Sequence, residues 1–201
     1  MRSAEIAYWN EVAESRTGKT GDFRDNIWKR QGLIRRLLDY NWIGECVLEV
    51  GVGHGLTAAV INLMVLGQMD YLGTDLSDQF CNYVSTRWKL KTVHTDVRSI
   101  PVDDEQFSRI LCLDSLEHVR PEDREQGYKE IYRVAEKNGL LLINMPLDES
   151  GHNPEFDYPF GLKDLEGLEA VGFKIERYEK YSVYTPNRTI NYGFAVLRKQ
   201  E

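Results

Sequence analysis

The chain of 201 residues has few of the features that would set it apart from ordinary globular proteins. It contains only 3 cysteines and no CxxC pair, so neither a disulfide framework nor a zinc site is indicated. No apolar run approaches the roughly 20 residues that a membrane-spanning helix requires. The N-terminus lacks the apolar core of a secretory signal. We therefore expect a cytoplasmic protein without a membrane partner, whose cysteines are reduced and packed as small apolar residues.

The chain also has fewer basic than acidic residues. The chain has 25 Lys and Arg against 32 Asp and Glu, a formal net charge of −7. A protein that grips a nucleic-acid backbone usually presents a basic face. We therefore expect a small-molecule substrate and no nucleic-acid partner. No repeat or Pro/Gly/Ser-rich linker divides the sequence, so a single domain over residues 1–201 is predicted, while the oligomeric state is not indicated.

Hydrophobic periodicity predicts a helical preface (1–40) that could act as a lid, followed by an α/β core (41–201). Helices are expected at 4–14, 26–40, 57–66, 77–89, 121–137 and 162–170. Strands are expected at 46–50, 71–74, 91–95, 107–113, 140–144, 173–181 and 192–197. Alternating strands and helices indicate a largely parallel sheet, in which ligands bind at the carboxyl ends of the strands. The last two strands, with no helix between them, are expected to pair antiparallel or to share a sheet edge.

A glycine-rich turn is the strongest local signal, in the segment VLEVGVGHG (47–55). Gly51, Gly53 and Gly55 follow an apolar strand and precede a helix. Glycine permits tight turns and the close approach of a ligand, because no Cβ intrudes. The dinucleotide fingerprint would require a glycine at position 56, where Leu56 stands. This departure disfavours a nicotinamide-dependent oxidoreductase.

Acidic residues follow the next two predicted strands. Asp75 lies about twenty residues beyond the glycines, where a carboxylate can accept hydrogen bonds from ribose hydroxyls. Asp96 follows the third strand, where a polar side chain could reach an adenine amino group. Taken singly, each residue is equally typical of a helix cap or a turn. Together, three successive strands end in features that suit an adenosine group.

The segments VLEVGVGHG, YLGTDLS, HTDV, FSRILCLDSLEHV and RVAEKNGLLLINMP resemble, in order and spacing, the successive motifs of class I S-adenosylmethionine-dependent methyltransferases. The resemblance covers roughly residues 42–198. It implies an enzyme of the EC 2.1.1 type with S-adenosyl-L-methionine as its cofactor. It also implies a Rossmann-like three-layer sandwich whose seven-stranded, mostly parallel sheet has an antiparallel last strand. The implied cofactor-binding residues are Glu49, Gly51, Gly53, Gly55, Asp75, Leu76, Asp96, Val97, Leu113 and Asp114.

Each part of the cofactor has an expected partner within this resemblance. Glu49 and the glycine turn are expected at its amino-acid end, and Asp75 at the ribose. Residues 96–97 are expected to border the adenine, and residues 113–114 to lie beside the methionine moiety.

The segment DSLEH (114–118) contains the expected catalytic residues, His118 and Glu117. If the segment begins a helical turn, Asp114 shares one face with them. We expect His118 to act as the general base that removes the acceptor's proton. Quinone-biosynthesis O-methyltransferases and small-RNA terminal methyltransferases resemble this spacing and bind a divalent cation there. In this chain the cation would lie on Asp114, Glu117 and His118, with His152 as a further ligand. Their first ligand is usually Glu, where Asp114 stands, so we expect no metal and keep this cation site as an alternative.

Two further segments bear on the substrate. The loop 146–160 is rich in acidic and aromatic residues and is expected to act as a lid. Tyr8, Trp9 and Trp28 of the preface are expected to pack on the sheet, and closure over the cofactor is the alternative.

The expected reaction is O-methylation of a hydroxyl on a small molecule. N-methylation of a small amine and methylation of RNA or another nucleic acid stay open as alternatives. So do two other classes of protein, namely the oxidoreductase and a cofactor-binding module without catalysis.

Overall fold

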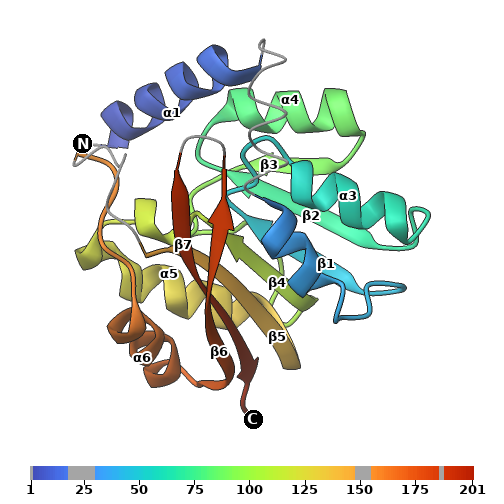
Figure 1. Cartoon of the computed structure of the whole chain (residues 1–201), viewed down its shortest axis with the longest axis vertical. Helices are drawn as coiled ribbons and strands as arrows, with labels where there is room; N and C mark the ends of the chain where they lie inside the picture. Colours follow the sequence, from blue (N-terminus) through green and yellow to red (C-terminus); the bar gives the residue numbers. More distant parts are fainter. Residues whose placement is uncertain (1, 18–29, 148–154, 186–187) are drawn as a thin grey trace.

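A seven-stranded sheet organises the chain in this computed structural model, which describes residues 2–17, 30–147, 155–185 and 188–201 (Figure 1). The strand order is β3-β2-β1-β4-β5-β7-β6. The strands are β1 (Cys46–Val50), β2 (Asp70–Asp75), β3 (Lys91–His94), β4 (Phe107–Leu113), β5 (Ala135–Pro146), β6 (Phe173–Tyr184) and β7 (Thr189–Lys199). The helices are α1 (Arg2–Thr17), α3 (Leu56–Met64), α4 (Asp78–Trp88), α5 (Pro121–Val134), α6 (Leu162–Ala170) and the 3-10 helix η1 (Leu116–His118), with a further helical segment at 30–37.

Strand directions confirm the expected fold class. The pairs β1–β2, β2–β3, β1–β4 and β4–β5 are parallel. The last strand, β7, lies between β5 and β6 and is antiparallel to both. The expected hairpin of the last two strands is therefore present, and the antiparallel strand is the one that the resemblance predicted. Strand order reverses between β1 and β4, which is where open α/β sheets bind their ligands.

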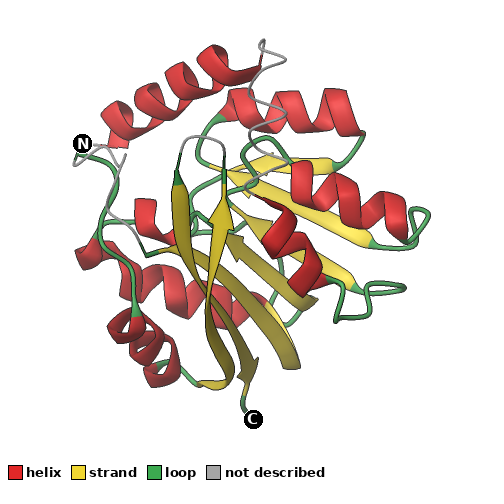
Figure 2. Cartoon of the chain, in the orientation of Figure 1, coloured by secondary structure: helices red, strands yellow, loops and turns green. Residues whose placement is uncertain are grey.

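Helices cover both faces of the sheet, as Figure 2 shows. Successive residues of a strand point to opposite faces. In β1, Leu48 belongs to the core cluster that contains Ile131 of α5, whereas Val47 belongs to the cluster that contains Ile61 of α3. Because both faces are covered, the central strands carry mostly apolar, buried side chains. This three-layer packing fixes the strand ends that carry the expected site.

Several elements end a few residues away from their predicted boundaries, and one of these differences has a clear physical cause. The helix expected at 121–137 ends at Val134, and β5 begins at once. The backbone N–H of Gln106 donates to the carbonyl of Val134 at 3.0 Å, and Phe107 pairs with Ala135. Sheet pairing with a distant segment therefore ends this helix ahead of the Asn-Gly pair, which lies within β5, where Asn138 has φ of 60°.

Helix α1 of the preface lies beside α4 (Figure 1). The Oγ of Ser77 donates to Oδ1 of Asn10 at 2.6 Å, and Nε2 of Gln79 donates to Oε1 of Glu14 at 2.8 Å. Of the helix expected at 26–40, residues 30–37 are helical, and the first four positions, Trp28 included, lie outside the described residues. None of the helices described is long and apolar enough to cross a membrane.

Candidate active site

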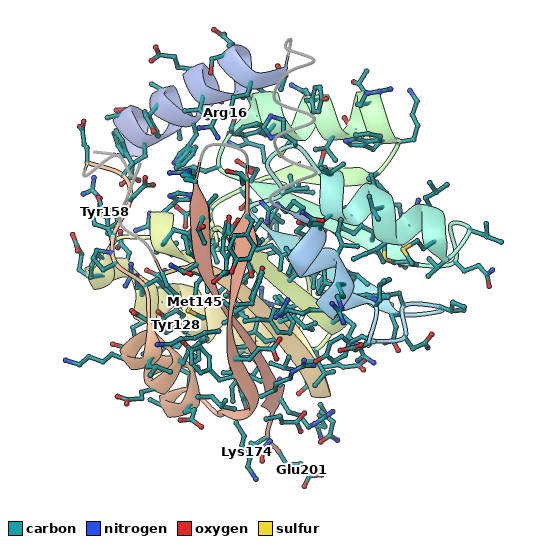
Figure 3. All side chains as sticks on the ribbon, viewed as in Figure 1. Arg16, Tyr128, Met145, Tyr158, Lys174 and Glu201 are labelled. Carbon is teal, nitrogen blue, oxygen red and sulfur yellow. The ribbon has the colours of Figure 1, made fainter. Side chains whose placement is uncertain are left out.

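A cavity of about 370 Å³ opens at the carboxyl ends of β1, β2, β3 and β4, a size typical of small-molecule sites. Every residue of the expected cofactor set lines it, namely Glu49, Gly51, Gly53, Gly55, Asp75, Leu76, Asp96, Val97, Leu113 and Asp114. The expected base, His118, lines it as well. Helix α1 adds Glu5, Trp9 and Arg16, and Arg16 projects from α1 toward the strand ends in Figure 3. The cavity is thus lined both by the expected cofactor-binding residues and by helix α1.

The glycine turn has the backbone geometry that its sequence predicted. Gly51 and Gly53 have φ of 75° and 49°, in the left-handed region that favours glycine. A Cβ on Gly51 would lie 2.5 Å from Cβ of Ser115, so the turn approaches the end of β4 closely. A Cβ on Gly53 would meet nothing within 4 Å and would enter the cavity that this residue lines. The turn therefore leaves room for a ligand at Gly53.

Asp75 ties the glycine turn to the end of β2. Its Oδ2 accepts a hydrogen bond from the N–H of Gly53, and its Oδ1 accepts one from the N–H of Ser77, both at 2.9 Å. Burial raises the pKa of Asp75, although these two hydrogen bonds oppose the rise. Two carboxylate oxygens offer about four acceptor positions. Asp75 can therefore hold the turn and still accept hydrogen bonds from a ligand.

Asp96 has a partner that sequence reasoning missed. Its Oδ1 accepts from the backbone N–H and Nε of Arg98 at 2.8 and 2.9 Å, and its Oδ2 accepts from Nη2 at 2.8 Å. Arg98 also forms an ion pair with Asp123. All three residues line the cavity beside Val97. The acid-x-Arg spacing was the available signal, and it places a guanidinium at the expected adenine end.

Glu49 is a buried carboxyl group, 3% exposed, in the lining of the cavity. The Oη of Tyr71 donates to its Oε2 at 2.7 Å. Burial raises the pKa of Glu49 to about 7, while Tyr71 and the charge of Arg30 oppose the rise. Its charge therefore changes near neutral pH.

Asp114 has φ of 55°, which is uncommon for a residue other than glycine. Side chains from distant segments hold it in place. Nη1 of Arg30 lies 3.1 Å from its Oδ2, and Nδ2 of Asn144 donates to its Oδ1 at 2.5 Å. Oη of Tyr181 in turn donates to Oδ1 of Asn144 at 2.7 Å. Sequence reasoning missed Arg30, Asn144 and Tyr181, because no local spacing links them to Asp114.

His118 is surrounded by groups from three segments. Nδ1 lies 2.6 Å from Oδ1 of Asp157 and 3.3 Å from the carbonyl oxygen of Phe156. The ring of Trp9 lies 4.5 Å from the imidazole, between centroids. Burial alone would lower the pKa of His118, but the charges of Glu117 and Asp157 outweigh it and raise the pKa. His118 is therefore a basic imidazole in the cavity wall. Trp9 packs on this imidazole and lines the cavity, so the prediction that it packs on the sheet is wrong.

Tyr8 also packs away from the sheet. Its ring stacks on that of Phe156, with 4.2 Å between centroids. The loop expected as a lid therefore meets α1 through this aromatic pair. His152 and the rest of 148–154 lie outside the described residues.

The segment 114–118 does not form one helical face. Asp114 has a left-handed backbone, and η1 begins only at Leu116. Asp114 therefore pairs with Arg30, whereas His118 pairs with Asp157. In the part of the chain that the structure describes, no group of three or more His, Cys, Asp or Glu side chains could hold a metal ion.

Glu117 lies behind His118. It is 4% exposed, and its Oε1 is 3.9 Å from Nε2 of His118. Burial raises the pKa of Glu117 to about 7, although the charge of His118 opposes the rise. The cavity lining includes His118 but not Glu117, so the expected catalytic residue Glu117 does not itself face the cavity.

Together, the sheet order, the glycine turn and the acidic residues at the strand ends match the Rossmann-like methyltransferase fold. Comparison with known proteins agrees. Residues 47–139 match a family model described as a methyltransferase domain. The comparisons support an S-adenosylmethionine-dependent methyltransferase of the EC 2.1.1 type. A search of curated proteins found no match.

Solved structures support the fold over nearly the whole chain. Magnesium protoporphyrin IX methyltransferase from Synechocystis PCC 6803, with bound S-adenosylhomocysteine, is 15% identical with a TM-score of 0.76, and the match covers 99% of each chain. The N-methyltransferase NodS from Bradyrhizobium japonicum WM9, also in complex with S-adenosylhomocysteine, is 13% identical with a TM-score of 0.75, covering 96% of this chain and 99% of that one. The [4+2]-cyclase SpnF is 19% identical with a TM-score of 0.66, covering 84% and 80%. At these identities the likeness concerns the fold alone.

Proposed function

We propose that this methyltransferase methylates a hydroxyl oxygen of a small-molecule acceptor, and that His118 removes the hydroxyl proton. One observation carries the proposal. The imidazole of His118 lies in the wall of the cavity that the glycine turn also lines, with a carboxylate on its Nδ1. S-adenosylmethionine supplies an activated methyl group when it is bound. The protein then has to position the acceptor and take its proton.

The lining residues fit the cofactor. Gly53 leaves open space, and the buried Oγ of Ser115 has no hydrogen-bond partner among the described residues. In our proposal Glu49 and the glycine turn hold the amino-acid end, and Asp75 holds the ribose. Residues 96–97 border the adenine, and residues 113–114 lie beside the methionine moiety, with Leu76 completing the set.

Hydrogen bonding selects the nitrogen of His118 that accepts the proton. A carboxylate accepts hydrogen bonds and cannot donate them, so the proton of a neutral imidazole lies on Nδ1 toward Asp157. The lone pair is then on Nε2. A hydroxyl loses its proton during methyl transfer and therefore needs a base. The imidazole of His118 is neutral above its own pKa and can then take this proton, which favours a hydroxyl as the acceptor.

A small acceptor is supported by the walls of the cavity. Glu5, Trp9 and Arg16 of α1 line it from the preface, and Tyr192 of β7 lines it from the sheet. The net charge of −7 is unfavourable to a polyanionic substrate. Methylation of a small amine is the second candidate, because NodS, one of the structurally similar proteins, is an N-methyltransferase. A neutral amine can react without a base.

The test begins with calorimetric titration of S-adenosylmethionine and S-adenosylhomocysteine, followed by a panel of hydroxyl and amine acceptors. For a hydroxyl acceptor, we expect His118→Ala to lower kcat by about 10²- to 10⁴-fold without changing cofactor affinity. His94→Ala, which changes a histidine outside the cavity lining, is the matched control. Normal turnover by His118→Ala would remove the base from the mechanism. Methylation of amines alone would favour the second candidate.

A further inference from the structure

The group that holds His118 comes from a different part of the chain. His118 ends η1, directly after β4, whereas Asp157 belongs to the segment 155–160 that follows β5. Both residues line the cavity, and the side chain of Asp157 is 11% exposed. Two loops at the same edge of the sheet thus bring a carboxylate onto an imidazole.

We propose that Asp157 is a positioning residue whose carboxylate orients the His118 ring and keeps its proton on Nδ1, so that Nε2 takes the proton of the acceptor. This inference rests on the proposed role of His118 as the base. The acceptor hydroxyl gives its proton to Nε2, and the proton on Nδ1 stays between the carboxylate of Asp157 and the carbonyl oxygen of Phe156. A base whose orientation and tautomer are set in advance loses less free energy to misalignment.

Asp157 fits this role better than Glu117, the other carboxyl group beside the ring. The distance from Nδ1 to Asp157 is 2.6 Å, within the range of a charge-assisted hydrogen bond. The distance from Nε2 to Glu117 is 3.9 Å, beyond that range. Glu117 also titrates near neutral pH, because burial raises its pKa to about 7.

The segment that carries Asp157 is itself fixed to the site. The N–H of Tyr158 donates to the carbonyl oxygen of Glu117 at 2.8 Å. The guanidinium of Arg124 donates to the carbonyl oxygens of Tyr158 and Pro159 at 3.3 and 3.0 Å. On the other side, Phe156 stacks on Tyr8. Asp157 is therefore held from both flanks before any ligand binds.

The charges that face His118 set the direction of the expected pH effect. Asp157 and Glu117 raise the pKa of His118, and the charge of Asp75 at the end of β2 also interacts with it. Helix α1 contributes the uncharged ring of Trp9. Burial lowers the pKa of a histidine, and the charge of Asp157 counteracts this effect. Removing that charge should therefore lower the pKa of His118. The acid limb of the rate profile must then move to lower pH.

The deciding experiment compares Asp157→Asn with Glu155→Gln, which neutralises an exposed carboxylate two positions earlier in the same segment. We expect Asp157→Asn to lower kcat at least about tenfold and to move the acid limb down by about one pH unit, with cofactor affinity unchanged. Glu155→Gln should match the wild type. Asp157→Glu should return the acid limb toward the wild-type position, because it restores the charge.

A double substitution separates positioning from a general structural effect. In a His118→Ala background, Asp157→Asn should cause no further loss, because its role is exerted through the imidazole. An additive loss, or an unchanged pH profile in Asp157→Asn, would overturn the proposal. Full activity of His118→Ala would instead overturn the proposed function itself. If Asp157→Asn is too unstable for kinetics, the pKa of His118 measured by NMR in Asp157→Glu should stay near the wild-type value, and a fall there would also contradict the proposal.

Discussion

The two halves of the cavity are held together in different ways. One half, formed by the glycine turn and the ends of β1 to β3, is the proposed cofactor half, and main-chain hydrogen bonds join its turn to the neighbouring strand. The N–H groups of Gly51 and Val52 both donate to the carbonyl oxygen of Thr74, at 2.8 and 2.9 Å. The other half, formed by α1, η1 and the segment 155–160, is the proposed acceptor half, and side-chain pairs such as Glu5 with Arg120 join its elements.

This difference determines how readily single substitutions can change the ligand that each half binds. A site built from main-chain groups depends on strand pairing and on a few glycines, so it suits a ligand that stays the same. A site built from side chains changes with single substitutions, so it suits a ligand that differs between relatives. We therefore expect the acceptor half to be the more sensitive to loss of one side chain, and the cofactor half to loss of one backbone conformation.

The largest effect is expected at Arg124, which anchors the acceptor half. This buried guanidinium, 5% exposed, donates to Oδ1 of Asp164 at 2.6 Å and to the carbonyl oxygens of Val119 and Pro159 at 3.0 Å. Arg124→Ala leaves these acceptors without their donor. We expect the free energy of unfolding to fall by about 3–5 kcal/mol, measured by urea denaturation.

Arg198→Ala is the matched control for that loss. Nη2 of Arg198 donates to Oε2 of Glu176 at 3.0 Å in an exposed pair, whose removal should cost about 1 kcal/mol or less. Equal losses in the two variants would mean that Arg124 does not anchor the segment 155–160, and the contrast between the halves would fail on the acceptor side.

The second effect concerns the cofactor half. Gly53 and Gly67 both have positive φ, 49° and 75°, and a Cβ on either would meet nothing within 4 Å. Only Gly53 lines the cavity. Gly53→Leu and Gly67→Leu should therefore suffer comparable backbone strain, but Gly53→Leu alone should weaken S-adenosylmethionine binding, by about 10- to 100-fold. Calorimetry on both variants measures this. Similar affinities would show that the turn does not contact the cofactor.

The same contrast explains how far the site could be predicted from the sequence. Gly53 and Asp75 each follow a strand, so contiguous motifs located them, and the parallel sheet brought them together. Asn144 lies 30 residues beyond Asp114, and no spacing rule pairs an amide with that carboxylate. The end of α5 was misplaced for a related reason, since distant strand pairing ended it. Contacts between distant segments depend on how the elements pack, and the spacing of apolar residues along the sequence does not reveal that packing.

The third effect is a pH dependence of the cofactor half. Burial raises the pKa of Glu49 from 4.5 to about 7, so between these values the folded state binds more protons than the unfolded state. Its contribution to stability is present at pH 4.5 and below and is lost as pH rises through 7. Ionised Glu49 is the form that can bind a cationic amino group, so S-adenosylmethionine affinity should rise from pH 6 to 8. Glu49→Gln should abolish this rise and weaken binding about tenfold at pH 8.

Glu117→Gln sharpens this prediction, because it changes a second buried carboxyl group whose pKa is also raised to about 7. Glu117 is not part of the cavity lining. Both variants should lessen the fall in unfolding free energy between pH 4.5 and 7, but only Glu49→Gln should alter the pH dependence of cofactor affinity. If Glu117→Gln altered it equally, the effect would be one of general charge.

The smallest effect is expected where α1 meets the acceptor half. Nε of Arg120 lies 2.6 Å from Oε1 of Glu5, and both side chains are partly buried. Glu5→Gln keeps the shape and removes the charge, so the unfolding free energy should fall by only about 1 kcal/mol or less. Hydrogen exchange should nevertheless quicken along α1, because this pair connects the helix to the residues beside η1.

Glu14→Gln is the control on the same helix, since Glu14 contacts Gln79 of α4 at the exposed side. If α1 closes the acceptor half, Glu5→Gln should raise KM for the acceptor several-fold and leave cofactor affinity unchanged, whereas Glu14→Gln should change neither. If Glu5→Gln weakened cofactor affinity as much as it raised KM for the acceptor, α1 would serve both halves equally. The side-chain contacts of α1 would then support the cofactor site as well, and the division between the two halves would have to be drawn elsewhere.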